Sequence, residues 1–374
     1  MTPLGSRLAA EIRASGPIGV DHFMGLALGD PEHGYYSRRD PLGVAGDFTT
    51  APEISQVFGE IIGAWLADSW RAMGSPDPVL LVELGPGRGT LAADILRTFR
   101  IMPACRAAAR LHLVETSPAL RERQRATLGG EPVWHDALDT VPDGPMLLVA
   151  NEFFDALPIR QFVYSGNAWH ERLVGLDATG ELVFVLGAAA APPPPIPLPQ
   201  GEGGRRGDLP LPLREGDGGR GQPPEGAVFE ICEPARDIAT AIGRRLAVHR
   251  GAALIIDYGH GKQGFGETLQ AVRAHRYAPV LDDPGEVDIT AHVDFAALGA
   301  ALAPAAVWGP VTQERFLAAN GVALREAALT RGTHEATATA IRRAVRRLLD
   351  PAAMGRLFKV LAATSPGLPC PAGF

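Results

Sequence analysis

The chain has 374 residues, which at about 150 residues per domain allows two domains or one domain enlarged by insertions. Thirty-five basic and 42 acidic side chains give a formal net charge of -7, so no general attraction to DNA or anionic lipid is expected. No run approaches the roughly 18 uninterrupted apolar residues that a membrane span requires. We therefore expect neither a DNA-binding protein nor a protein inserted in a membrane.

Cysteine usage and the first residues bear on the compartment. The three cysteines, an odd number without CxxC spacing, predict neither a disulfide framework nor a metal site. The first twenty residues lack the apolar stretch of a secretory signal. Two lysines against 33 arginines, with much Ala and Gly, indicate a GC-rich coding bias. Together these features predict a bacterial cytoplasm, and an amphipathic segment around Arg7 and Arg13 leaves a leader to the mitochondrial matrix as the alternative.

Short apolar strands alternate with helices along most of the chain. An amphipathic helix is predicted over 56–71, a second over 90–100, and a third begins at Ser117-Pro118, with proline at the first helical position. The predicted strands are 78–83, 110–115, 132–135, 145–150 and 251–257. This order is typical of an α/β protein with a doubly wound parallel sheet.

The composition changes between Ala188 and Glu225, where PPPP, GEGGRRG and GDGGRG occur with few apolar residues. Such a segment is predicted to be disordered. It separates two peripheral strands, 182–186 and 228–232. Besides an insert without function, a proline-rich docking peptide for a partner stays open.

A glycine-rich loop follows the first buried strand: Glu83-Leu-Gly85-Pro-Gly87-Arg-Gly89. Glycines allow a tight turn and a close backbone approach to a ligand, and the N-terminus of the next helix offers unpaired N-H groups. Thr90 stands where a dinucleotide-binding loop would carry its last glycine. Glu83 can accept hydrogen bonds from an ammonium group, which a pyrophosphate site would not need.

Acidic and amide side chains also follow the next strands, at the edge where a doubly wound sheet binds ligands. Glu115 could accept the ribose hydroxyls of an adenosine, and Asp136 could meet its amino group; a helix cap and a turn residue are the alternatives. The fourth strand leads into Asn151-Glu152-Phe153-Phe154-Asp155, where the two aromatics could be core residues. Asp257, after the fifth strand, could be catalytic or could only shape the end of the sheet.

The segment 46–55 precedes the helix predicted over 56–71. It could simply cap that helix. Alternatively it folds over the ligand, with Phe48 and Thr49 contacting it and Glu53 near its carboxylate end.

Several long motifs together resemble the MidA family: residues 34–65, VELGPGRGTLAADIL (82–96), NEFFDALPIRQF (151–162), IDYGH (256–260), TLQAVRAHRY (268–277) and DITAHVDF (288–295). The resemblance spans residues 1 to about 365 apart from the insert. It implies a class I, Rossmann-like methyltransferase core with added N-terminal helical and peripheral α+β or helical elements. It also implies the cofactor S-adenosylmethionine, with Gly85, Gly87 and Gly89 at its methionine end and Glu115 on its ribose.

On this basis the chain is divided into consecutive parts. They are an N-terminal helical and lid region (1–75), a first part of the core (76–186), the insert (187–226), a second part of the core (227–310) and a C-terminal helical region (311–374).

The mitochondrial members of this family assist the assembly of respiratory complex I and act as protein arginine methyltransferases, so the resemblance implies a complex I subunit as the protein substrate. A guanidinium acceptor must be held by carboxylates, for which Glu152 and Asp155 are the first candidates. His292, a possible proton acceptor, and Asp294 are the second. An assembly chaperone that binds the cofactor without transfer, and a small-molecule or RNA methyltransferase, stay open, as does the oligomeric state.

Overall fold

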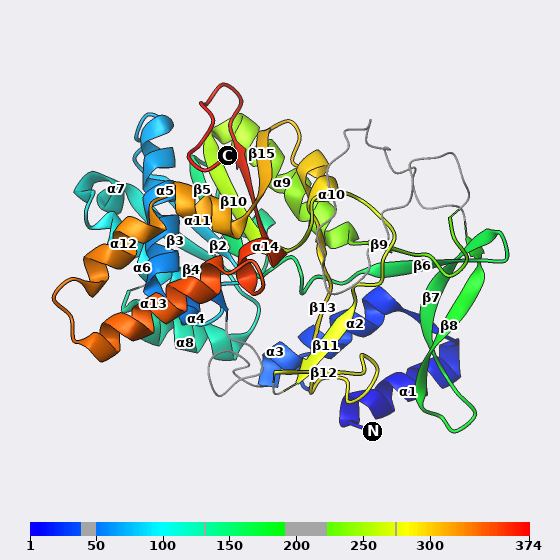
Figure 1. Ribbon diagram of the computed structural model, residues 1–374. Coiled ribbons are helices and arrows are strands. Elements are labelled where there is room, and N and C mark those ends of the chain that lie inside the picture. The colour runs from blue at the N-terminus through cyan, green and yellow to red at the C-terminus, as the bar shows by residue number, and fades with distance from the viewer. Residues whose placement is uncertain (39–49, 131, 191–222, 274) are drawn as a thin grey trace. The chain divides into compact units, whose positions relative to one another are not determined.

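The structure is a computed structural model that describes residues 1–38, 50–130, 132–190, 223–273 and 275–374. The chain forms two compact units (Figure 1). Unit 1 comprises 1–35, 157–234 and 262–291, and unit 2 comprises 36–156, 235–261 and 292–374. The units interleave along the sequence, whereas the predicted parts are consecutive. That division stays a prediction.

Unit 2 contains an eight-stranded sheet in the order β15-β16-β10-β5-β2-β3-β4, with β14 pairing with β10. The pairs β10–β5, β5–β2, β2–β3 and β3–β4 are parallel, while β16 runs antiparallel to both β10 and β15. The strands are β2 (Val79–Leu84), β3 (Ala109–Val114), β4 (Val133–His135), β5 (Met146–Asn151), β10 (Gly251–His260), β14 (Val293–Asp294), β15 (Ala306–Thr312) and β16 (Phe358–Thr364).

Every residue of β2 and of β5 is buried, so both faces of the sheet are covered, as in doubly wound proteins. From β2 the chain proceeds outward to β3 and β4, then returns to the other side of β2 for β5 and β10. The strand order therefore reverses between β2 and β5, and at such a point the connections diverge and leave a crevice at the carboxyl ends of the strands. The five predicted parallel strands and the α/β class are confirmed.

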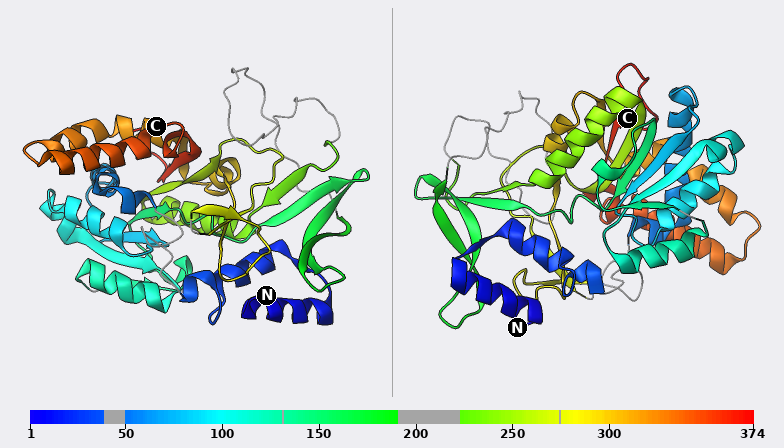
Figure 2. Two further views of the ribbon diagram at one scale, coloured as in Figure 1. Left: turned by 60° about the horizontal axis from the view of Figure 1, so that its bottom comes forward. Right: turned by 180° about the vertical axis from the view of Figure 1, so that it is seen from behind.

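The helices of unit 2 pack around this sheet (Figure 2). One large core joins one side of the strands to α5, α6, α11 and α13. The helices are α4 (Ala51–Ile54), α5 (Gln56–Ala72), α6 (Thr90–Phe99), α7 (Pro103–Ala108), α8 (Pro118–Leu128), α9 (Glu233–His249, in this unit from Ala235), α10 (Phe295–Ala301), α11 (Gln313–Ala319), α12 (Val322–Thr330), α13 (Glu335–Leu349) and α14 (Met354–Leu357), with a 3-10 turn at Leu138–Thr140. Helices α12 and α13 lie side by side (Figures 1 and 2).

Unit 1 is built on antiparallel strands. A five-stranded sheet has the order β1-β7-β6-β9 with β8 on β7, and a three-stranded sheet has the order β12-β11-β13. The strands are β1 (Ile18–Gly19), β6 (Arg160–Ser165), β7 (Ala168–Leu176), β8 (Leu182–Ala190), β9 (Val228–Ile231), β11 (Gln270–Arg273), β12 (Arg276–Ala278) and β13 (Asp288–Thr290); the helices are α1 (Pro3–Ser15) and α2 (Val20–Gly29). Short α3 (Tyr35–Arg38) lies where the chain passes into unit 2.

Strand β8 corrects a boundary of the prediction, and helix α1 bears on the N-terminal segment. Strand β8 continues to Ala190, so residues 187–190 belong to a strand and not to the insert; most of the insert lies outside the described residues. Helix α1 buries Leu4, Leu8 and Ile12, so the apolar side of the amphipathic segment around Arg7 and Arg13 is covered. Within the described ranges, no helix is long and apolar enough to cross a membrane.

The contact between helices α5 and α6 in unit 2 depends on two glycines of α5. A Cβ at Gly59 would lie 2.4 Å from Cβ of Asp94, and one at Gly63 would lie 2.9 Å from Cβ of Thr98. Both partners belong to α6, so α5 and α6 approach each other over a strip without side chains.

Replacing Gly59 by alanine should therefore destabilise the protein. The gain in helix propensity of about 1 kcal/mol is smaller than the strain of forcing a buried methyl group against Asp94, and we expect a net loss of about 1–3 kcal/mol. Urea denaturation of Gly59→Ala measures it. Ala64→Ser, at an exposed position of the same helix, is the control and should change the unfolding free energy by less than about 0.5 kcal/mol. A Gly59→Ala protein as stable as wild type would contradict the proposed close packing.

Candidate active site

The glycine loop lies at the carboxyl end of β2, beside the point where the strand order reverses. Gly85, Gly87 and Gly89 have φ values of 61°, 53° and 80°, which other residues rarely adopt. A Cβ at Gly85 would also lie 2.8 Å from the ring of Phe153. The loop therefore needs glycine for its backbone and for its close approach to the end of β5.

Glu83, the acid that precedes this loop, is 4% exposed. Burial raises its pKa to about 8, against a hydrogen bond from the backbone N-H of Ala92 that lowers it, and the charge of Asp94 adds to the rise. Its Oε2 atom is buried without a hydrogen-bond partner in the described part of the chain. At neutral pH this carboxyl holds a proton unless a positive charge is placed beside it.

Asn151 ends the neighbouring strand β5 and is buried as well. Its Nδ2 donates to Oε1 of Glu152 over 3.0 Å, while its Oδ1 is buried without a partner among the described residues. Two oxygen atoms from adjacent strands, Glu83 Oε2 and Asn151 Oδ1, are therefore buried without a hydrogen-bond donor among the described residues. A buried acceptor of this kind is expected to have a partner.

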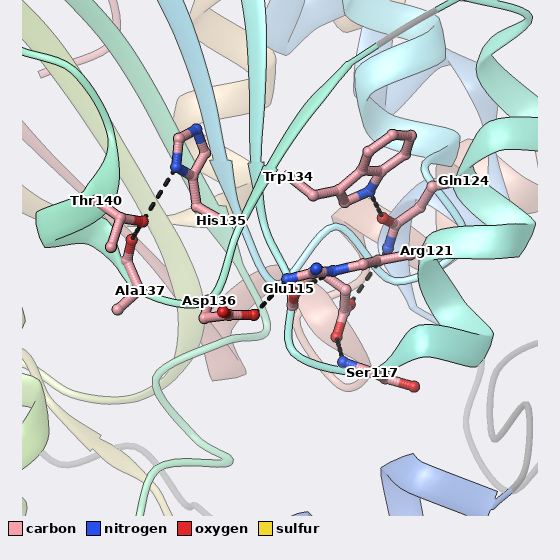
Figure 3. Close-up of polar contacts among 9 residues, drawn as sticks. All are labelled: Glu115, Ser117, Arg121, Gln124, Trp134, His135, Asp136, Ala137 and Thr140. Atoms are coloured by element: carbon pink, nitrogen blue, oxygen red, sulfur yellow. Dashed lines mark hydrogen bonds and ion pairs between the residues drawn. The ribbon is translucent and has the colours of Figure 1, made fainter.

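Glu115 follows β3 and is 9% exposed. Oε1 accepts from the N-H of Ser117 (2.8 Å) and Oε2 from Nε2 of Gln124 (3.2 Å) (Figure 3). Burial raises its pKa, partly offset by these hydrogen bonds. Each carboxylate oxygen has a second lone pair, so Glu115 can still accept from a pair of hydroxyl groups.

Asp136 differs from the other strand-end acids, because its side chain is 82% exposed. It accepts from Nη2 of Arg121 over 2.6 Å, and the same guanidinium donates to the backbone carbonyl of Glu115 (Figure 3). Nδ1 of the preceding residue, His135, lies 3.1 Å from Oγ1 of Thr140 (Figure 3). The predicted contact of Asp136 with an adenine amino group would have to form beside this ion pair, and it stays a prediction.

Glu152 and Asp155 lie directly beyond β5. Glu152 has a φ of 50°, a strained value for a residue with a side chain, and its Oε1 accepts from the N-H of Ala51 over 3.0 Å. Asp155 is 6% exposed and its Oδ1 is without a partner in the described ranges. Burial raises the pKa of Asp155 to about 6, while a hydrogen bond from Tyr258 lowers it.

Another buried acid, Asp257 near the end of β10, holds this loop in place. Its Oδ2 accepts from three consecutive backbone N-H groups, those of residues 153, 154 and 155, over 3.2, 3.0 and 3.2 Å. Its Oδ1 accepts from the N-H of Tyr258. Three convergent N-H groups form a site for a negative charge, although burial and the charges of Asp155 and Glu152 raise the pKa of Asp257. The sequence left the role of this residue open.

His292 precedes β14, which pairs with the end of β10. Its ring lies 5.5 Å from that of Tyr258, edge to face. Burial lowers the pKa of His292 to about 4, with the charges of His260 and Lys359 adding to the effect, so its imidazole is neutral at pH 7. Asp294 caps α10 by accepting from the N-H groups of Ala296 and Ala297.

The segment predicted to form a lid is described only from residue 50 onward. Phe48 and Thr49 lie outside the described residues. Glu53, in α4, accepts from Oγ1 of Thr90 and lies 3.7 Å from Nη1 of Arg88. It thus contacts the first residue of α6 and the arginine of the glycine loop. The structure brings together most of the predicted site residues, since Glu53, Glu83, Glu115, Asn151, Glu152 and Asp155 all lie at the loop or at the ends of the adjacent strands.

A doubly wound sheet of this strand order, with an acid-flanked glycine loop at its reversal point, defines the protein as a methyltransferase of the class I fold. Residues 61–310 match a family described as S-adenosyl-L-methionine-dependent methyltransferase. The chain belongs to this family, the MidA family that its motifs resemble, and is an S-adenosylmethionine-dependent methyltransferase.

Similar proteins support this assignment over almost the whole chain. The mitochondrial protein arginine methyltransferase NDUFAF7 of Danio rerio is 34% identical, covering 94% of this chain and 84% of its own. The protein of the same name from Homo sapiens is 34% identical, covering 97% and 83%. A crystal structure of a COG1565 superfamily member from Burkholderia thailandensis, bound to S-adenosyl-homocysteine, has a TM-score of 0.77 at 29% identity and covers 99% of this chain and 93% of its own.

These relatives overturn one expectation. Both NDUFAF7 proteins are named as mitochondrial, so the prediction of a bacterial cytoplasm is wrong. Its basis was a coding bias, the cysteine pattern and a missing secretory signal. None of these features separates a cytoplasm from the interior of an organelle.

The residues at the loop fit S-adenosylmethionine. The partnerless oxygens of Glu83 and Asn151 suit an ammonium group, the glycines leave backbone accessible, and Glu115 can accept from two hydroxyls. Among the described residues, no cluster of three His, Cys, Asp or Glu side chains is arranged to hold a metal ion.

Asp257→Asn should loosen the loop that carries Glu152 and Asp155. The amide has one oxygen, so in either orientation its NH2 group faces at least one backbone N-H group, and we expect a loss of about 2–4 kcal/mol in the free energy of unfolding. Urea denaturation measures the loss. Asp177, an exposed aspartate that also accepts from two backbone N-H groups, provides the control variant Asp177→Asn. An equal loss in the two variants would contradict a special role of the buried carboxylate.

Proposed function

We propose that this methyltransferase modifies an arginine side chain of a protein, and that the substrate is a subunit of respiratory complex I. The observation that carries the proposal is the pair of carboxylates, Glu152 and Asp155, held at the end of β5 beside the proposed donor site. The names of the NDUFAF7 relatives support arginine as the acceptor. Complex I is the substrate that the resemblance to the MidA family implies.

In the proposed donor site, Glu83 and Asn151 bind the amino end of S-adenosylmethionine and Glu115 binds its ribose. The glycines from 85 to 89 keep the loop free of side chains there. When bound, the cofactor supplies a methyl group on a positively charged sulfur, which leaves with the electrons of the broken carbon-sulfur bond. The protein mainly has to align the acceptor with that bond.

The acceptor nitrogen forms a bond to the methyl carbon and must give up one proton. Glu152 and Asp155 would hold the guanidinium in a fixed orientation through charge-assisted hydrogen bonds. With a pKa of about 6, Asp155 is largely ionised at pH 7 and still basic enough to accept that proton. Neutral His292, whose ring lies 5.5 Å from that of Tyr258, is the second candidate for accepting the proton.

Transfer of a labelled methyl group into an extract of a deletion strain tests the function. Wild type should label arginine in a complex I subunit, identified by mass spectrometry. Glu115→Ala should lose both binding of S-adenosylhomocysteine and labelling. Asp155→Asn should keep binding within about threefold and lose about 100-fold in rate, the size of a general-base contribution.

The alternatives give different results in the same experiment. Label in RNA or in a small molecule would overturn the protein substrate. A binding-competent Asp155→Asn protein that supports complex I assembly as well as wild type, without labelling, would favour the chaperone.

Donor binding should also release a proton. Burial raises the pKa of Glu83 from its ordinary value of 4.5 to about 8 in the folded protein, so its carboxyl is protonated at pH 7. In the unfolded chain the carboxyl would lose its proton near pH 4.5, so the folded state loses stability as the pH rises from about 4.5 to 8. A ligand ammonium beside the carboxyl favours its ionised form. S-adenosylhomocysteine should therefore release up to one proton at pH 7 and almost none at pH 9.

Calorimetry in two buffers of different ionisation enthalpy measures this release. Glu83→Gln should abolish it. Glu230, a partly buried carboxyl of unit 1 whose pKa is also raised by burial, gives the control Glu230→Gln, in which the release should persist. Equal release by wild type and Glu83→Gln would remove Glu83 from the donor site.

A further inference from the structure

Gln124, in the middle of α8, is the common partner of three separate parts of the proposed donor site. Its side chain is fully buried. Its Oε1 accepts from Nε1 of Trp134 over 2.7 Å, and its Nε2 donates to the backbone carbonyl of Gly87 over 2.7 Å and to Oε2 of Glu115 over 3.2 Å. Figure 3 shows the side chain between Trp134 and Glu115.

These contacts leave one orientation for the amide. An indole N-H only donates, while a carbonyl and an ionised carboxylate only accept. The amide oxygen must therefore face Trp134, and both N-H groups of the amide are used on the side of the site. No other uncharged side chain of this length offers one acceptor and two donors in this arrangement.

The three partners lie far apart in the sequence but border one place. Gly87 is the central glycine of the loop after β2, Glu115 follows β3, and Trp134 lies in β4. A Cβ at Gly89 would lie 3.5 Å from both Cα and Cγ of Gln124, so the loop also packs on this residue. Trp134 is itself covered by the guanidinium of Arg125, 4.5 Å from its ring centroid.

We propose that Gln124 is a positioning residue for S-adenosylmethionine binding. It sets the distance between the Gly87 carbonyl and the Glu115 carboxylate, and Trp134 fixes its amide in turn. It acts through these residues and need not touch the donor. This inference rests on the donor site proposed above, because it explains how that site is kept in shape before the donor binds.

Three variants separate its contacts. Gln124→Glu keeps an oxygen for Trp134 but turns the second oxygen toward the Gly87 carbonyl and the Glu115 carboxylate. Gln124→Met removes all three hydrogen bonds at similar volume. Trp134→Phe removes the anchoring N-H, together with part of the ring, and leaves Gln124 itself in place. The control is Gln313→Met, since Gln313 is also fully buried in unit 2 and donates to a backbone carbonyl, that of Leu348, over 2.9 Å.

The Kd for S-adenosylhomocysteine, measured by calorimetry on the full chain, should rise most in Gln124→Glu, about 30-fold or more. It should rise about 10-fold in Gln124→Met, corresponding to about 1.4 kcal/mol, and about threefold in Trp134→Phe. KM for the donor should rise in parallel, with kcat at saturating donor within threefold of wild type. Gln313→Met should lower the midpoint of thermal unfolding without changing the Kd.

A spectroscopic readout reports the contact itself. The indole N-H resonance of Trp134, assigned by its loss in Trp134→Phe, should shift when S-adenosylhomocysteine is added to wild type. In Gln124→Met it should lie upfield and no longer respond to the ligand.

Glu115→Gln distinguishes the possible failures. If Glu115→Gln weakens binding but both Gln124 variants bind like Gln313→Met, the positioning role is wrong. If Glu115→Gln binds as tightly as wild type, the donor site is misplaced, and the role of Gln124 falls with it. Equal losses of affinity in Gln124→Met and Gln313→Met would reduce Gln124 to a structural residue.

Discussion

The reversal of strand order between β2 and β5 is the constraint on which the site depends. Because the chain leaves these two strands in opposite directions, no connection closes the space beyond their carboxyl ends. The glycine loop and the segment from Asn151 to Asp155 both begin there. The polar residues that bind and react can gather at this edge, while the strands beneath them are wholly apolar on both faces apart from Glu83 and Asn151.

Gathering acids at one buried edge has an energetic cost, and the structure limits it by different means at each position. Glu115 and Asp257 are satisfied by N-H donors of the protein itself. Glu83 and Asp155 each keep an oxygen without a partner in the described ranges, and burial raises the pKa of both. Among the described residues, the acids at this edge therefore differ in how completely the protein itself supplies them with hydrogen bonds.

Much of this could be predicted from the sequence, and the reason is local. Buried parallel strands appear as short apolar runs, and the acids that end them stand directly after those runs, so Glu83, Glu115 and Glu152 could be identified without any long-range contact. The glycine spacing from 85 to 89 likewise requires only positive φ values. Strand-end acids are not all alike, however. Asp136 follows β4 as Glu115 follows β3, yet it is exposed and paired with Arg121.

What could not be predicted depends on contacts between distant segments. Strands β6 and β9 pair although the segment 191–222 separates them in the sequence. Composition and local patterns carry no information about such long-range pairing, so the interleaving of the two units could not be predicted. Asp257 ends an apolar strand like several other acids, and only the convergence of three N-H groups from residues 153 to 155 shows its role. Gln124 is harder still, because a glutamine in a helix of low mean hydropathy reads as a solvated residue. Its importance comes from three partners separated from it by 9 to 37 positions.

Within the described ranges, Glu83 and Asn151 each keep one oxygen without a hydrogen-bond partner, and in the proposed site this deficit is a means of discrimination between ligands. If every polar atom of the pocket already had a hydrogen-bond partner in the protein, a neutral and a positively charged ligand would bind with similar affinity, because neither would supply a missing hydrogen bond. A buried carboxyl that is protonated when alone gains most from a ligand that brings both a positive charge and N-H donors. In the proposed donor site, this arrangement at the end of β2 would therefore favour a cationic, ammonium-bearing donor over the nucleotides that other doubly wound proteins bind at the same edge. The hydrogen bonds of Gln124 and Asp257 keep the surrounding framework rigid enough for that preference to be expressed.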